Sequence, residues 1–144
     1  MKTRWAALMA AVALAGCQQG PSAEDAWVRL PAVPGRPAAG YATVRGDGSS
    51  DRVLVGVSSP AAKRAELHES MAGHGGMMAM QPLRHVAIAK GEAASFAPGG
   101  KHIMLFGLSP DLRAGGSVPM TFAFEDGAKI TVDAKLVAAG DPGS

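Results

Sequence analysis

Hydrophobic and polar residues alternate along most of the chain after residue 25, in short runs separated by Gly, Pro, Asp and Ser. Alternation with a period of two gives a segment one dry and one wet face, which is the pattern of a half-buried β-strand. The clearest run covers residues 129–137, and the Asp-Gly pair shortly before it is typical of a hairpin turn. Further upstream, Val53, Val55 and Val57 share one face, and we expect that face to be the buried one.

Ten such runs predict ten strands and little helix. Segments 59–62 and 110–114 allow one helical turn each, and no stretch after residue 25 keeps a helical period over three turns. Many short strands at regular spacing predict an all-β fold, either a sandwich or a barrel. The predicted strands cover residues 26–30, 41–45, 52–58, 63–69, 77–83, 86–89, 93–96, 101–105, 118–125 and 129–137.

The first residues of the chain have the pattern of an export signal. Lys2 and Arg4 precede an apolar run over residues 6–15. This run is shorter than the roughly 20 residues that span a bilayer, and its length is typical of a signal-peptide core. The segment LAGC at residues 14–17 resembles the bacterial lipobox, in which the Cys is acylated and becomes the first residue of the mature protein. The alternative is an ordinary signal peptide that is cleaved nearby, in which case Cys17 has no role.

The lipobox divides the chain into four predicted parts. Residues 1–16 form the signal peptide, and residues 17–25 form the lipidated Cys with a polar, flexible spacer. Residues 26–137 form the β-domain, and residues 138–144 form a short disordered tail. We therefore expect a protein that is lipid-anchored through its Cys on the periplasmic face of a bacterial membrane. Gln18 after the Cys slightly favours the outer membrane.

Composition narrows the range of functions. The 144 residues allow one domain. Lys and Arg total 14 and Asp and Glu total 12; without Lys2 and Arg4 the balance is 12 to 12. Electrostatic binding of nucleic acid is therefore not expected. The single Cys excludes an intrachain disulfide and a Cys-rich zinc site, and the unusual feature that remains is the eight Met residues.

Four residues indicate a candidate metal site. On their predicted strand, His102 and Met104 project from one face, with Cα atoms about 7 Å apart. His68 shares the polar face of its strand with Glu66, and Met80 lies in a Met-rich run. Two imidazoles and two thioethers form a soft donor set, which suits Cu(I) better than Ca²⁺, Mg²⁺ or Zn²⁺. Each residue also has an alternative role without metal, because Met often fills gaps in hydrophobic cores and a lone His is usually solvated or hydrogen-bonded to a neighbour.

The spacing of these four residues resembles that of the PCuAC family of periplasmic copper chaperones. The family pattern is His, an optional Met, ten residues, Met, twenty-one residues, His, one residue and Met. Here ten residues separate Glu69 from Met80, twenty-one separate Met80 from His102, and Ile103 separates His102 from Met104. The surrounding sequence is similar to the family at residues 26–29, 58–62, 66–68, 98–100 and 105–108.

This resemblance implies a cupredoxin-like Greek-key β-sandwich over residues 26–137 that binds Cu(I) and has no enzymatic activity. It also implies a copper-accepting partner, such as the copper centre of a respiratory cytochrome oxidase or another periplasmic cuproprotein. Glu69 occupies the optional Met position, and residues 138–144 contain no His or Met for a further site. The ligands implied are His68, Met80, His102 and Met104.

A second group of candidate ligands lies in the Gly-rich segment before Met80. Met71, His74 and Met78 crowd this segment, where they offer a secondary loading site for copper. The alternative is that they are ordinary residues of a flexible loop.

Other functions fit less well or stay open. Blue-copper electron transfer needs a Cys thiolate, and Cys17 lies outside the predicted domain. A hydrolase is disfavoured because the chain has no nucleophile elbow and no zinc signature. A structural or interaction β-sandwich lipoprotein without metal remains an alternative, because a sandwich fold alone implies no function. A copper-buffering or resistance protein is another.

Overall fold

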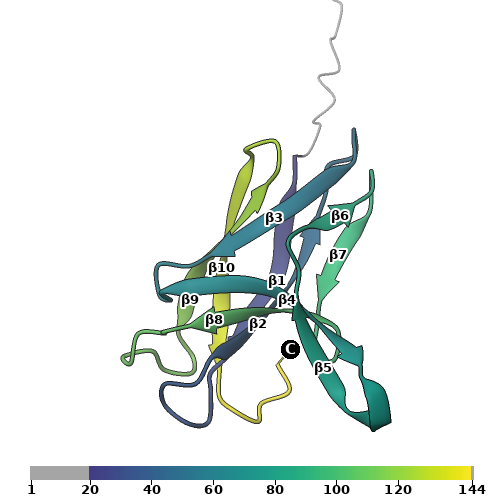
Figure 1. Ribbon diagram of the computed structural model, residues 1–144. Helices are drawn as coiled ribbons and strands as arrows, with labels where there is room; N and C mark the ends of the chain where they lie inside the picture. Colours follow the sequence, from purple (N-terminus) through teal and green to yellow (C-terminus); the bar gives the residue numbers. More distant parts are fainter. Residues whose placement is uncertain (1–19, 144) are drawn as a thin grey trace, which may run out of the picture.

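The computed structural model describes residues 20–143, which form β-strands joined by loops (Figure 1). Within these residues there are ten strands and one short 3-10 turn, η1 (His74–Gly76), so the all-β prediction is confirmed. The strands are β1 (Ser22–Arg29), β2 (Ala38–Arg45), β3 (Arg52–Ser58), β4 (Arg64–Ala72), β5 (Met78–Pro82), β6 (Val86–Ile88), β7 (Ala93–Phe96), β8 (Lys101–Phe106), β9 (Ser117–Phe124) and β10 (Lys129–Val137).

The strands of the described region pair into one mixed sheet. Their order is β5-β4-β8-β2-β1-β10-β9-β3-β6, and β7 pairs with β2 beside this path. Strands β1 and β10 run parallel, whereas the other pairs are antiparallel. In Figure 1, β3 and β4 cross in front of β1 and β10, so the sheet folds over itself. Strand β5 lies at one edge of this sheet.

The apolar sides of the strands meet in one core. The prediction for β10 is confirmed, because Ala134 and Leu136 are buried while Lys135 between them is exposed. The turn before β10 is the predicted hairpin turn, in which Gly127 has φ +89°, a conformation that favours glycine. The largest fully buried side chains of the core are Val28, Val44, Leu54, Ile88, Ile103, Leu105, Met120 and Phe122.

The buried face of β3 differs from the prediction. Leu54 is fully buried, whereas Val55 is 43% exposed. The pairing of β3 with β9 shifts register between Leu54 and Gly56, which is a β-bulge. One extra residue reverses the alternation, so Leu54 and Val57 both pack toward the core. The expected shared dry face of Val53, Val55 and Val57 is therefore wrong.

Residues beyond the predicted β-domain make contacts at both of its ends. Strand β1 begins at Ser22, so residues 22–24 of the predicted spacer pair with β2, and Glu24 forms an ion pair with Arg45 at 2.6 Å. Near the other end, Arg29 Nε donates a hydrogen bond to the carbonyl of Asp141 at 2.9 Å. Asp141 of the predicted tail therefore contacts β1 through this bond.

The predicted export signal lies outside the described residues. This applies to residues 1–16 and to Cys17. Between residues 20 and 143, no helix has the length and apolar character needed to cross a lipid bilayer.

Candidate metal site

The two predicted histidine ligands lie directly opposite each other on neighbouring strands. Strands β4 and β8 are antiparallel, and their register pairs His68 with His102. The two ring centroids are 5.9 Å apart and the ring planes are tilted by 35°. Leu67 and Ile103 alternate with them and point into the core, being 3% and 0% exposed. Strand alternation therefore sends both imidazoles to the opposite side of the sheet.

The two predicted methionine ligands lie on the same side of the sheet. Met104 is two residues beyond His102 and is half-buried. Met80 on β5 pairs with Ser70 of β4, two residues from His68. Because directly paired residues and residues two apart share a face, all four predicted ligands project from one face of β5, β4 and β8. We call this surface the histidine face; it comprises His68, Ser70, Met78, Met80, His102, Met104 and Glu66, which pairs with Met104.

Hydrogen bonds fix which nitrogen of each histidine carries its proton. His68 Nε2 lies 2.9 Å from Glu66 Oε2, and His102 Nδ1 lies 2.9 Å from the carbonyl oxygen of Gly100. A carboxylate and a carbonyl only accept hydrogen bonds, so in each case the imidazole donates. The remaining atoms, His68 Nδ1 and His102 Nε2, are buried and have no hydrogen-bond partner.

Unpartnered buried nitrogen atoms are rare in proteins and need an explanation. In a neutral imidazole, the nitrogen without a proton carries the lone pair that binds a metal, while the other N–H is held by a carboxylate or carbonyl. His68 and His102 both have this arrangement, with opposite nitrogens free. The histidine face therefore presents two buried, unpartnered ring nitrogens, and Met80 and Met104 project from the same face.

Glu66 is the residue that the sequence did not single out as part of this site. It accepts a hydrogen bond from His68 through Oε2, and its Oε1 contacts Arg64 Nε at 2.6 Å. The hydrogen bond from His68, and then the charge of Arg64, lowers the pKa of Glu66. The carboxylate thus stays ionised and holds the His68 ring. Its position two residues before His68 on the same strand face was the available signal.

The donors on this face differ from those of a hard metal site. Among residues 20–143, no three side chains of His, Cys, Asp or Glu come together in a way that can hold a metal ion. The predicted ligands on the histidine face are instead two imidazoles and the thioethers of Met80 and Met104, which are donor types that suit a soft ion.

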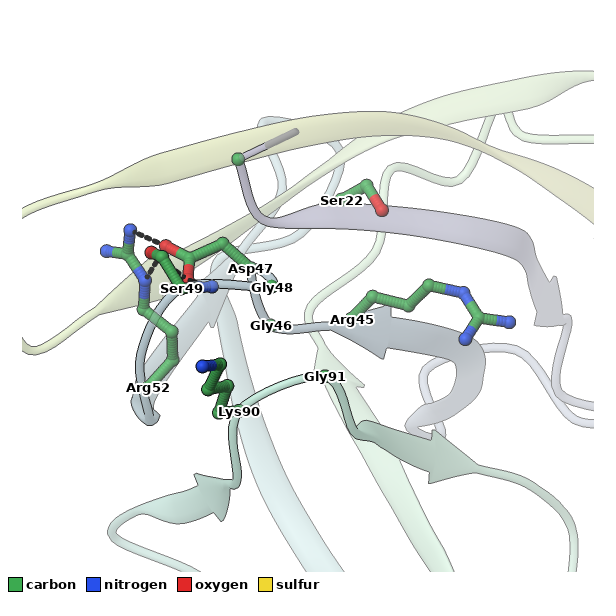
Figure 2. Close-up of a pocket in the computed structure, with 10 residues that line it drawn as sticks. Ser22, Arg45, Gly46, Asp47, Gly48, Ser49, Arg52, Lys90 and Gly91 are labelled. Carbon is green, nitrogen blue, oxygen red and sulfur yellow. Dashed lines mark hydrogen bonds and ion pairs between the residues drawn. The ribbon is translucent and has the colours of Figure 1, made fainter. Parts of the chain in front are cut away.

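A polar pocket lies away from the histidine face and contains none of the predicted ligands (Figure 2). Asp47 is 5% exposed, and it accepts hydrogen bonds from the Ser49 side chain and from Arg52 Nε at 2.7 and 2.9 Å. Arg52 also contacts Asp126, which lies in the turn before β10. Asp47 and Arg52 therefore form an ion pair. Through Arg52 this pair links the loop between β2 and β3 to the turn between β9 and β10.

The proposed secondary ligands lie on the hairpin formed by β4 and β5. Met71 pairs with Ala79, and Met78 pairs with Ala72, so the two thioethers project from opposite faces of the hairpin. Only Met78 shares the histidine face. His74 lies in η1 at the hairpin tip.

The chain matches a protein family along most of its length. The family model described as "Putative lipoprotein LpqE-like" matches residues 22–136. A curated relative, "Putative lipoprotein Lxx21020" from Leifsonia xyli subsp. xyli (strain CTCB07), is 36% identical over 109 residues. This match covers 76% of the present chain and 64% of the relative, so the chain spans less than two thirds of that protein.

Solved structures have the same fold. A copper-bound PCuAC domain from PmoF2 has a TM-score of 0.68 and 24% identity, covering 84% of this chain and 95% of that domain. The apo PCuAC domain from PmoF1 has a TM-score of 0.67 and 25% identity, covering 84% and 96%. The solution structure of CuI-DR1885 from Deinococcus radiodurans has a TM-score of 0.59 and 28% identity, covering 88% and 83%. The chain therefore belongs to the LpqE-like lipoprotein family and has the PCuAC fold that its sequence predicted.

Proposed function

We propose that this protein is an extracytoplasmic copper chaperone that binds one Cu(I) ion on its histidine face. The ligands in this proposal are His68 Nδ1, His102 Nε2 and the thioether sulfurs of Met80 and Met104. The observation that carries it is the pair of buried, unpartnered imidazole nitrogens on directly paired residues. The likeness to the solution structure of CuI-DR1885, which is 28% identical, adds support.

The chemistry of the donor set suits delivery rather than permanent storage. All four donors are neutral, so they hold Cu(I) without the strong charge attraction of thiolates. The exposure of the donors also differs along the face. His102 is 6% exposed and Met80 is 59% exposed. An acceptor protein can therefore reach Met80 first and replace the ligands one after another, while the histidines still hold the ion.

The start of β1 and the hairpin of β4 and β5 lie at different ends of the described region. In Figure 1 strand β1 begins at the top, whereas the hairpin projects at the bottom. A lipid anchor at Cys17 would join the membrane to the chain before β1. Tethering raises the effective concentration near a membrane-bound acceptor, such as the copper centre of a cytochrome oxidase or another cuproprotein outside the cytoplasm.

Competition titration tests copper binding directly. The purified chain is titrated with Cu(I) under anaerobic conditions against a chromogenic Cu(I) chelator. We expect one tightly bound Cu(I) per chain, and at least about tenfold weaker binding in Met104→Leu and Met80→Leu, as for losses of metal-site groups generally. Met71→Leu is the matched control, because Met71 lies on the other face of the same hairpin.

The titration also distinguishes the alternatives. A wild-type chain that binds no Cu(I) would contradict the proposal and leave a structural lipoprotein domain. Binding without transfer to any apo-cuproprotein would favour copper buffering, which a transfer assay with a purified apo copper domain measures. Equal affinities in Met104→Leu, Met80→Leu and wild type would show that the copper lies elsewhere.

A further inference from the structure

Exposed methionines are concentrated on one hairpin. Of the six large hydrophobic side chains that are exposed in the described region, four belong to the hairpin of β4 and β5; the other two are valines. Strand β5 lies at the edge of the sheet and all five of its residues are exposed. Core packing therefore does not explain the exposed thioethers, which are Met71, Met77, Met78 and Met80.

The register of the hairpin separates these thioethers into two sets. Met80 pairs with Ser70 and Met78 pairs with Ala72, so both belong to the face that carries His68. Met71 pairs with Ala79 and belongs to the opposite face. Met78 is thus the one further thioether of the described region that continues the line of donors on the histidine face.

The line of donors runs from the interior to solvent. His102 is 6% exposed, the His68 side chain 14%, Met80 59% and Met78 64%. Residues two apart on a strand have Cα atoms about 7 Å apart, which is within reach of two flexible methionine side chains that share one ion. Met78 and Met80 therefore offer a two-thioether position at the exposed edge of the four-ligand site, with Met80 common to both.

We infer that Met78 forms, with Met80, an entry and exit position for Cu(I). This inference rests on the proposed function and names the route by which the ion reaches the histidines. Cu(I) first binds the two exposed thioethers, which only a soft ion does well. Met80 then remains bound while His68, His102 and Met104 replace Met78 and the ligands of the copper donor.

The step is ligand exchange and involves no redox chemistry. Copper remains Cu(I) throughout, each incoming sulfur or nitrogen donates a lone pair, and each outgoing ligand keeps its own. Glu66 and the Gly100 carbonyl each accept a hydrogen bond from one ring nitrogen, so in the neutral imidazole the other nitrogen keeps a lone pair for the ion.

Rapid-mixing kinetics of Met78→Leu test this inference. The full chain is mixed with a coloured Cu(I)–chelator complex, and the rate of copper uptake is followed by absorbance. We expect at least about fivefold slower uptake and release, with an equilibrium affinity within about twofold of wild type, because a residue used only on the route changes rates and not the bound state. Met71→Leu, on the opposite face, should match wild type in both measurements.

Methyl NMR gives a second, direct readout. In a chain labelled at the methionine methyl groups, Cu(I) added below one equivalent should shift or broaden the Met78 signal through exchange and leave the Met71 signal in place. Wild-type rates in Met78→Leu would overturn the inference and leave the four-ligand site intact. A loss of equilibrium affinity as large as that of Met80→Leu would overturn it too, by making Met78 a ligand of the main site. Absence of Cu(I) binding in wild type would overturn the proposed function and this inference together.

Discussion

At the scale of single residues, the site depends on which nitrogen of each histidine is free. His68 and His102 are related by strand pairing, yet they present different atoms because their hydrogen-bond acceptors differ. Glu66 holds one ring through a side chain, and the Gly100 carbonyl holds the other through the backbone. Partners of this kind raise the basicity of a metal-binding imidazole and fix its orientation.

Removal of the Glu66 carboxylate should weaken copper binding. In Glu66→Ala the His68 Nε2–H loses its acceptor, so the ring no longer has one preferred orientation or tautomer. We expect Cu(I) affinity to fall by about tenfold to a hundredfold, measured by the same chelator competition. Glu66→Gln keeps an acceptor oxygen and should recover part of the loss. Glu69→Ala is the control, because Glu69 faces away from the site and pairs with Lys101 at 3.3 Å; an equal loss in this control would contradict the assignment.

At the scale of strands, the site depends on how closely β8 packs between its neighbours. Strand β8 pairs with β4 on one side and with β2 on the other, where Gly40 is opposite Ile103. A methyl group on Gly40 would lie 3.0 Å from Leu105 Cδ1 and 3.3 Å from Ile103 Cβ. Both neighbours are fully buried in a close-packed core, so a shift of either side chain disturbs other contacts.

Gly40→Ala should therefore destabilise the fold. We expect the free energy of unfolding to fall by about 1–3 kcal/mol, the usual effect of overpacking a close-packed core, as measured by urea denaturation. Gly56→Ala in β3 is the matched control, since its new methyl group meets no atom within 4 Å, and its effect should stay within about 0.5 kcal/mol. Equal stabilities of the two variants would contradict this account of β2 and β8.

At the scale of the whole molecule, the polar network around Asp47 connects the loop between β2 and β3 to the turn between β9 and β10. Asp47 lies between β2 and β3, and its partner Arg52 also contacts Asp126 in the turn between β9 and β10. Hydrogen bonds from the Ser49 side chain, from Arg52 and from the backbone of Ser49 and Ser50 hold the pKa of Asp47 below its usual range. The carboxyl group thus releases its proton more easily in the folded chain than in the unfolded chain.

This pKa difference makes part of the stability depend on pH. A carboxyl with a lowered pKa in the folded state stabilises the fold above its unfolded pKa of about 3.9, and the contribution is lost as pH falls toward the folded value. Asp47→Ala should lower Tm by several degrees at pH 7, and the difference from wild type should shrink below about pH 4. Asp111→Ala, at an exposed loop position, is the control. A difference that is unchanged at pH 3 would contradict the ionised role of Asp47.

The sequence by itself determined the strands and the kinds of donor available for a metal. Alternation is a local property, so β3, β7 and β10 have the predicted bounds. Residue types, together with the resemblance to the PCuAC family, indicated His68, Met80, His102 and Met104. The pairing of strands cannot be predicted from a short stretch of sequence, because the register depends on loops, bulges and the packing of strands that are distant along the chain. Only the tertiary structure decided that His68 lies opposite His102 and which nitrogens are free. It also decided that a bulge buries Leu54 in place of Val55, and that Met78 belongs to the histidine face while Met71 does not.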